Sequence, residues 1–317
     1  MRTRLGDRAA AMAALIWLAG GCATFDTQIP ESLEPSVKLA GTPFYPQLQN
    51  HCGPAALSTL LEASGVRPDY DEVAERVYIP GLEGSLQVEM MAAARRYDRI
   101  PYRVPGELSA LLTEVEAGHP VLILQNLRVR SLPVWHYAVV IGYDRDQNQI
   151  LMRSGTEREL STPTGRWMRR WDWASRWAIV VLEPGDLPVS AELPAVLRAL
   201  SDFDEHGSAQ ARLKAWRAAS EKWPREPLAW MGLGNAHYAL GEREAAASHL
   251  RQTLEIRPGH WPARLNLAQL LLELDQPCRG KKVIQARSMP FDYPLMQAHG
   301  KLSIRLDQAC EAKNRSG

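Results

Sequence analysis

The sequence lacks a hydrophobic run long enough to cross a membrane, and it carries almost no net charge. A spanning helix needs about 20 apolar residues, and the N-terminal apolar stretch, residues 9–21, is shorter than that. Lys and Arg number 37 against 36 Asp and Glu, which gives no support to nucleic-acid binding. The sequence has neither a glycine-rich phosphate loop nor metal-ligand spacing, so we expect no cofactor and no metal.

The short apolar stretch is instead typical of an export signal. It follows a basic start with three arginines and ends in the small pair Gly20-Gly21, directly before Cys22. The segment "LAGGC" resembles a bacterial lipoprotein signal, which predicts removal of residues 1–21 and lipidation of Cys22. An ordinary secretory signal, with Cys22 as a bystander, is the alternative.

The residues after Cys22 predict a tether and a location. Residues 22–42 contain Pro30 and Pro35 and show little periodicity, which predicts a tether between lipid and domain. Ala23 resembles the sorting pattern of outer-membrane lipoproteins in Gram-negative bacteria. We therefore expect a lipid-anchored protein of the cell envelope, at the periplasmic face of the outer membrane, with the lipid as its sole membrane contact.

Cysteine is scarce, with four residues in the chain. Cys278 and Cys310 both lie in the C-terminal region, and export to an oxidising compartment would allow a disulfide between them. The two could equally stay reduced in separate helices, because sequence alone does not give their distance. Cys52 is left without a partner, which marks it for attention in an exported protein.

The first half of the mature chain predicts an α+β domain over residues 43–187. Its pattern is helical at first and then changes to β-branched and aromatic runs separated by turn formers. We expect helices at 53–64, 70–77, 85–98 (with Ser85 as N-cap) and 107–118, and antiparallel strands at 120–127, 136–144, 149–154 and 177–184.

The second half, residues 192–317, predicts an all-α repeat domain. Pro224 and Pro258 are 34 residues apart, and the segment between them carries Trp, Gly, Tyr and Ala at repeat-like positions. This segment resembles the tetratricopeptide repeat, with a weaker repeat before it and another beginning near residue 262. Stacked repeats of this kind bury a shared core and leave a face that binds a protein partner. A generic helical hairpin is the alternative.

Cys52 has a setting that favours chemistry. Pro54 suits the first turn of a helix, so Cys52 lies at a helix N-terminus, where the dipole lowers a thiol pKa. Gln47, five residues upstream, can supply an amide donor beside the Cys52 N–H for an oxyanion. Among eight histidines, His136 starts a strand after "LPVW" and is the candidate base.

Three segments in order then give a family resemblance: "PFYPQLQNHCGPAAL", "GHPVLILQN" and "WHYAVVIGYD". They resemble the bacteriocin-processing, double-glycine-leader cysteine peptidases of papain-like fold, over roughly residues 43–185. The resemblance implies Cys52 as the nucleophile, His136 as the general base and Gln47 as the oxyanion-hole amide. The leader specificity is not carried over, because that activity is normally fused to an exporter.

The third member of the triad departs from the family. An Asp or Asn usually orients the histidine, but Asp144 lies eight residues along the same strand, roughly 26 Å away. A hairpin at 144–148 would instead return Ser154 or Thr156 beside His136. Ser154 can accept a hydrogen bond but cannot stabilise an imidazolium by charge. The site is then a Cys–His dyad oriented by Ser154 or a backbone carbonyl, or it no longer turns over.

Two readings of function follow. The first is an exported, lipid-anchored cysteine peptidase that hydrolyses peptide bonds, with repeats that recruit a protein substrate or partner. The second is a papain-like adaptor, catalytically weak or inactive, that serves protein–protein interaction in the periplasm. Acyl transfer on the same scaffold differs from hydrolysis in its acceptor alone, and the sequence does not separate the two.

Overall fold

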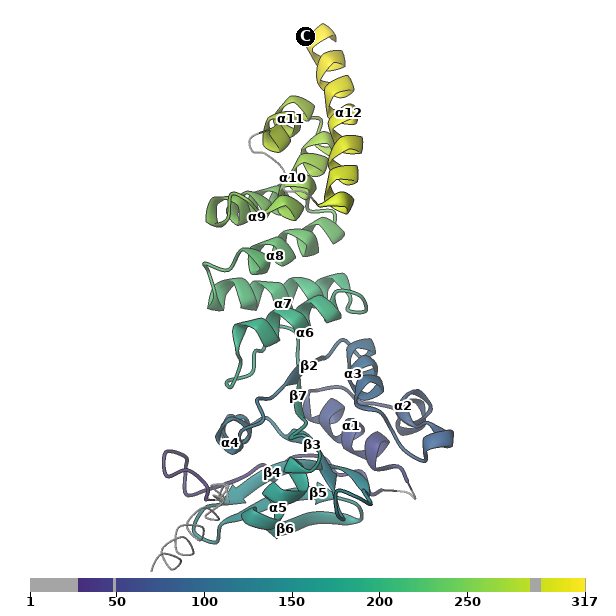
Figure 1. Ribbon diagram of the computed structural model, residues 1–317, viewed down its shortest axis with the longest axis vertical. Helices are drawn as coiled ribbons and strands as arrows, with labels where there is room; N and C mark the ends of the chain where they lie inside the picture. Colours follow the sequence, from purple (N-terminus) through teal and green to yellow (C-terminus); the bar gives the residue numbers. More distant parts are fainter. Residues whose placement is uncertain (1–27, 48–49, 286–291, 317) are drawn as a thin grey trace, which may run out of the picture.

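The structure is a computed structural model and describes residues 28–47, 50–285 and 292–316. The predicted signal peptide and Cys22 lie outside these residues. No helix of the described chain has both the length and the apolar character that a membrane span requires. The molecule consists of an α+β domain from which a stack of helices extends (Figure 1).

A seven-stranded antiparallel sheet forms the centre of the α+β domain. Its strand order is β2-β7-β3-β4-β5-β6, and β1 pairs with the far end of β4, beyond β3. Its strands are β1 (Ser36–Lys38), β2 (Ile100–Arg103), β3 (Val121–Asn126), β4 (Trp135–Asp144), β5 (Gln149–Ser154), β6 (Glu157–Pro163) and β7 (Ala178–Leu182). All six residues of β3 are buried, as expected for a continuous apolar run at the centre of a covered sheet.

Helices cover both faces of the sheet. On one face lie α1 (Cys52–Ala63), α2 (Tyr70–Val77) and α3 (Gln87–Arg96), whose apolar side chains pack with Leu122, Tyr137 and Val139. The other face is covered by α4 (Leu108–Glu116) and α5 (Thr164–Asp172). Because strand side chains alternate, β3 and β4 contribute to both cores. This arrangement fixes the N-terminus of α1 against the start of β4.

The predicted tether is not a tether where the structure describes it. Ile29 and Leu33 are 3% and 8% exposed and belong to the main core, and β1 adds to the sheet through backbone pairing with β4. Gly142 on β4 permits this approach, since a Cβ there would lie 2.3 Å from the Val37 carbonyl oxygen. Residues 28–42 therefore form part of the domain.

The C-terminal half is entirely helical where it is described. Its helices are α6 (Leu193–Phe203), α7 (Ala209–Lys222), α8 (Pro227–Ala239), α9 (Arg243–Ile256), α10 (Trp261–Glu273), α11 (Pro277–Gln285) and α12 (Tyr293–Ser316). Successive helices contact one another and rise away from the sheet, from α6 beside it to α12 at the far end (Figure 1). Cys278 and Cys310 form a disulfide that joins α11 to α12.

The repeats attach directly to the sheet. Leu200 and Phe203 of α6 lie in the same apolar core as Ile100 and Tyr102 of β2. An ion pair between Arg95 and Asp202 (2.8 Å) reinforces this contact at its rim. The two parts therefore share one core and are not separated by a flexible linker.

Candidate active site

Cys52 is the first residue of α1 and the free cysteine of the described chain. Asn50 adopts a left-handed backbone conformation (φ 60°), and His51 is the N-cap of the helix, so the chain turns sharply before the cysteine. The ring of His51 packs on Tyr78, with centroids 4.6 Å apart. Cys52 itself is partly buried, with its sulfur at a helix N-terminus.

Gly53 is required by the packing beside Cys52. A Cβ at this position would lie 2.2 Å from the Oγ and 2.6 Å from the Cβ of Ser85, which precedes α3. Ser85 was predicted as the N-cap of that helix, but the helix begins at Gln87, with Leu86 as its N-cap. Ser85 is therefore a packing residue that presses against the first turn of α1.

His136 and Ser154 meet across the β4–β5 hairpin. His136 is the second residue of β4, and Ser154 is the last residue of β5, which returns antiparallel to β4. The His136 Nε2 lies 2.9 Å from the Ser154 Oγ. With Nε2 donating its proton to the serine oxygen, Nδ1 is the ring atom left to accept a proton.

Gln47 lines the same cavities as Cys52 and is bound to the β4–β5 hairpin. Its backbone N–H donates to the carbonyl oxygen of Gly155, at 3.0 Å, directly after Ser154. Arg153 holds the segment that leads to Gln47 through hydrogen bonds to the carbonyls of Thr42 (2.9 Å) and Ala40 (3.4 Å). Buried hydrogen bonds from one side chain thus fix the approach of residues 40–47 to β5.

One cavity brings the predicted residues together. It has a volume of about 650 Å³, and Gln47, Cys52 and His136 all line it. A second, much smaller cavity behind the thiol is lined by Gln47, Cys52 and Ser154. The four residues singled out from the sequence therefore surround one point of the fold, at the junction of α1, β4 and β5.

The electrostatics of the site favour a neutral pair at rest. Burial raises the pKa of the Cys52 thiol, although hydrogen bonds from the backbone N–H groups of Tyr137, Gly53 and Cys52 itself act in the opposite direction. Burial, with a further contribution from the charge of Arg170, lowers the pKa of His136 to about 4. The expectation of a lowered thiol pKa at the helix N-terminus is therefore wrong, since desolvation outweighs the helix N–H groups.

Two groups that shift the pKa values of Cys52 and His136 were not predicted from the sequence. The Tyr137 N–H acts on the Cys52 sulfur from the strand, which places the thiol against the backbone directly after His136. Arg170 acts on His136 from α5, an element that the sequence analysis did not assign. Trp167 and Met168 precede Trp171 by four and three residues, with arginines between them, and this spacing was a signal for an amphipathic helix.

The described chain offers nothing that would hold a metal. It contains no cluster of three or more His, Cys, Asp or Glu side chains in ligating positions. The chemistry available to the site is that of a thiol, an imidazole, an amide and backbone N–H donors.

Comparison with known proteins agrees with this arrangement. Residues 40–175 match the model of the Peptidase_C39 like family, and residues 239–289 match the tetratricopeptide repeat. No curated protein matches the chain. The fold class predicted from the sequence, an α+β papain-like domain of C39 type followed by an all-α repeat region, is confirmed.

Several solved structures resemble parts of the chain. A C39-like peptidase from Bacillus anthracis is 18% identical, with a TM-score of 0.41, over 47% of this chain and 98% of its own. The peptidase domain of Streptococcus ComA, a bifunctional ABC transporter involved in quorum sensing, is 18% identical, with a TM-score of 0.36, over 44% of this chain and 98% of its own. MamA is 12% identical, with a TM-score of 0.30, over 39% of this chain and 81% of its own.

Proposed function

We propose that this chain is a cysteine peptidase in which Cys52 is the nucleophile and His136 the general base. The observation that carries the proposal is the single cavity that Gln47, Cys52 and His136 line, with Ser154 on the far nitrogen of the imidazole. Packing alone does not require a thiol, an imidazole and an amide to converge on an accessible cavity.

The proposed reaction follows from the neutral resting pair. As the Cys52 sulfur attacks the scissile carbonyl, its proton passes to His136 Nδ1, and the oxyanion accepts hydrogen bonds from the Gln47 amide and the Cys52 N–H. His136 then returns the proton to the leaving amine, which departs as the C–N bond breaks. Water attacks the resulting thioester by the same route, with His136 as base, and releases the acid and the thiol.

Ser154 has a positioning role in this scheme. By accepting a hydrogen bond from the Nε2–H it keeps His136 in the tautomer whose Nδ1 can act as base. It adds no charge, so the imidazolium formed during the reaction is less stabilised than it would be beside a carboxylate. We therefore expect slow turnover compared with a Cys–His–Asp enzyme.

The repeat region and the N-terminus complete the proposal. We propose that the repeats bind a protein substrate or partner, and that lipid on Cys22 holds the chain at the periplasmic face of the outer membrane. The repeats support the first statement, because such stacks expose a binding face. The residues "LAGGC" support the second.

Peptide hydrolysis by the full-length mature chain tests the proposal. Cleavage of a mixed peptide library, read by mass spectrometry, is expected for the wild type and lost in Cys52→Ala and His136→Ala. His206→Ala, which replaces an exposed histidine of the helical half, is the matched control and should cleave normally. Equal cleavage by wild type and Cys52→Ala would refute the assignment.

A second candidate function is a peptide-binding adaptor without turnover. Ser154 in place of an acid, together with a neutral thiol and a neutral imidazole, favours it. Peptide binding without hydrolysis, by the wild type and Cys52→Ala alike, would support the adaptor. Product carrying an added amine in place of water would instead indicate acyl transfer.

A further inference from the structure

The catalytic cavity continues into a second one. Beside the cavity of about 650 Å³ lies another of about 420 Å³, and Ser85, Leu86, Trp135 and Tyr137 line both. The second cavity ends at Ala174 and Ser175, in the turn after α5. Together they form one groove that passes the thiol of Cys52 and extends beyond it, long enough for a peptide rather than a single side chain.

Both walls of this groove expose apolar side chains. On the wall before α3, Leu82 is 60% and Leu86 45% exposed. On the opposite wall, at the start of β4, Val134 is 39% and Trp135 54% exposed. Large apolar side chains gathered on facing walls of a cavity mark a binding surface, whereas single exposed ones do not.

The groove is almost free of charge. Glu83 is the one ionisable acidic or basic side chain, other than the reacting pair, among the residues that line its two parts. Apart from Glu83, nothing in the lining would pair with a lysine or arginine of a ligand, and nothing in it would pair with a carboxylate. A charged ligand side chain placed there would lose its hydration without compensation.

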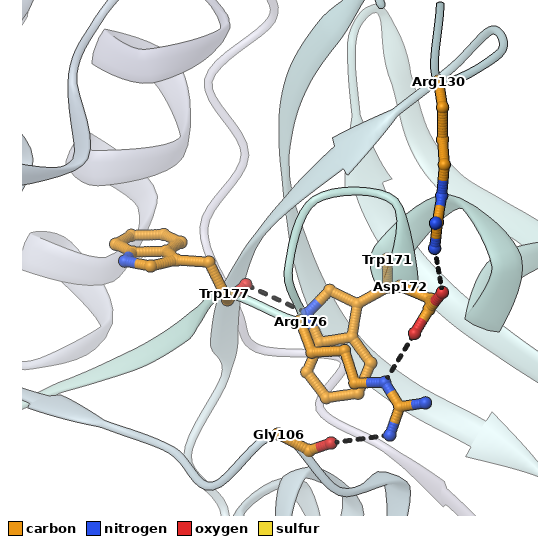
Figure 2. Close-up of polar contacts among 6 residues, drawn as sticks. All are labelled: Gly106, Arg130, Trp171, Asp172, Arg176 and Trp177. Atoms are coloured by element: carbon orange, nitrogen blue, oxygen red, sulfur yellow. Dashed lines mark hydrogen bonds and ion pairs between the residues drawn. The ribbon is translucent and has the colours of Figure 1, made fainter.

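The wall that carries Trp135 is held rigidly. The Asn126 Oδ1 accepts hydrogen bonds from the N–H groups of Arg128 and Val134, both at 3.0 Å, across the base of the β3–β4 loop. Arg130, near the tip of that loop, reaches Asp172 at the end of α5, at 3.0 Å (Figure 2).

The far end of the groove is fixed by the same network. Asp172 also binds Arg176 (3.1 Å), which donates to the carbonyl of Gly106 (3.2 Å), while the Trp171 ring N–H donates to the carbonyl of Trp177 (3.0 Å; Figure 2). These contacts lock the turn at 172–176 that supplies Ala174 and Ser175. A groove ordered before binding loses less entropy when a ligand enters.

We propose that this groove selects peptides with bulky, uncharged apolar side chains next to the reacting bond, held between Leu86 and Trp135. The inference rests on the proposed function in taking Cys52 and His136 as the centre of the groove. The ligand is an extended peptide, because the groove continues from the cavity that Cys52 lines into the second one. Peptides with charged residues, or with two glycines, at the same place bind weakly.

Binding to the full-length Cys52→Ala protein tests this selection without any turnover. The probes are fluorescein-labelled, serine-flanked octapeptides with a central Phe-Leu, Gly-Gly, Lys-Lys or Glu-Glu, followed by fluorescence anisotropy. The Phe-Leu peptide should bind at least about tenfold more tightly than the other three, because even one methylene group in a fitted apolar pocket gives roughly 10- to 200-fold discrimination. Equal affinities, or tighter binding of the glycine or charged peptides, would overturn the proposal.

Substitutions on the two walls locate the effect. Adding Trp135→Ala or Leu86→Ala to this protein should each weaken Phe-Leu binding at least about fivefold and leave the other probes unchanged. Ile304→Ala, which removes a side chain that is 60% exposed on α12, is the control and should have no effect. An unchanged preference in both wall variants would contradict the assignment.

The outcomes separate this inference from the proposed function. If the protein prefers apolar peptides in binding but the wild type hydrolyses nothing, the proposed selectivity of the groove stands and the proposed peptidase activity is refuted. If hydrolysis depends on Cys52 but shows no preference for apolar residues, the proposed peptidase activity stands and the proposed selectivity of the groove is refuted.

Discussion

Ser154→Asp should convert the site into a faster one. The Ser154 Oγ lies 2.9 Å from His136 Nε2, so an aspartate side chain at 154 would place a carboxylate oxygen beside the same nitrogen. An opposite charge at this distance raises a histidine pKa by about 1 to 3 units. The pKa of His136, now about 4, should therefore rise to roughly 5 to 7.

The size of the effect on rate follows from that shift. Each pKa unit corresponds to about 1.4 kcal/mol of added stabilisation of the imidazolium, and about the same amount in the transition state gives a tenfold rate change. Since the charge is only partly developed in the transition state, we expect kcat/KM to increase about 10- to 100-fold. Arg153 lines the small cavity next to residue 154 and would favour the ionised aspartate.

Two assays follow the change, and one of them does not need turnover. Peptide hydrolysis gives kcat/KM, and iodoacetamide alkylation of Cys52 between pH 4 and 9 reports thiolate formation. In Ser154→Asp the alkylation profile should shift to lower pH, because a protonated His136 stabilises the thiolate. Ser154→Asn is the matched neutral control. If the two variants agree within about twofold in both assays, the charge argument is refuted.

Two further predictions concern stability. His136 is neutral in the fold and has a pKa of about 4 against 6.5 when unfolded, so the unfolded state binds more protons between these values. The contribution of His136 to folding stability should therefore drop by about 3 kcal/mol as the pH falls through this range. Urea titrations of His136→Gln should lack this part of the pH dependence. Gly53→Ala should destabilise the protein by about 1 to 3 kcal/mol through its clash with Ser85. Adding Ser85→Gly should restore most of this loss. If the double variant is no more stable than Gly53→Ala alone, the clash is excluded as the cause.

The parts of the fold that the sequence predicted are those with local periodicity. The helix at 70–77 has the predicted bounds, and the helix predicted at 53–64 is shifted by one residue, because apolar spacing and turn formers define both. Gly118 adopts the expected positive φ of 93° after α4. The strands at 136–144 and 149–154 were also anticipated, and the short turn between them returns Ser154 to His136.

Two of the strands that were missed have no local signature. β1 is three residues long in a proline-containing segment and exists through backbone pairing with β4. β6 lies at the edge of the sheet and is largely exposed, so it carries no apolar alternation to recognise. The raised pKa of Cys52 also has no local signal in the sequence, because it depends on burial by segments distant in sequence.

The repeats join the sheet directly, and this restricts where a protein bound to them can lie relative to the groove. Because α6 shares its core with β2, a partner bound to the repeats is held at a fixed distance from the groove. A tethered substrate segment gains effective concentration at the groove when its own length matches that distance, and loses it when it is too short. The repeats should therefore select substrates by the spacing between a docking segment and a cleavable one, while the groove reads the residues at the bond. A series of substrates that differ in this spacing alone should show a maximum in kcat/KM, whereas a flexibly linked repeat domain would give a flat dependence.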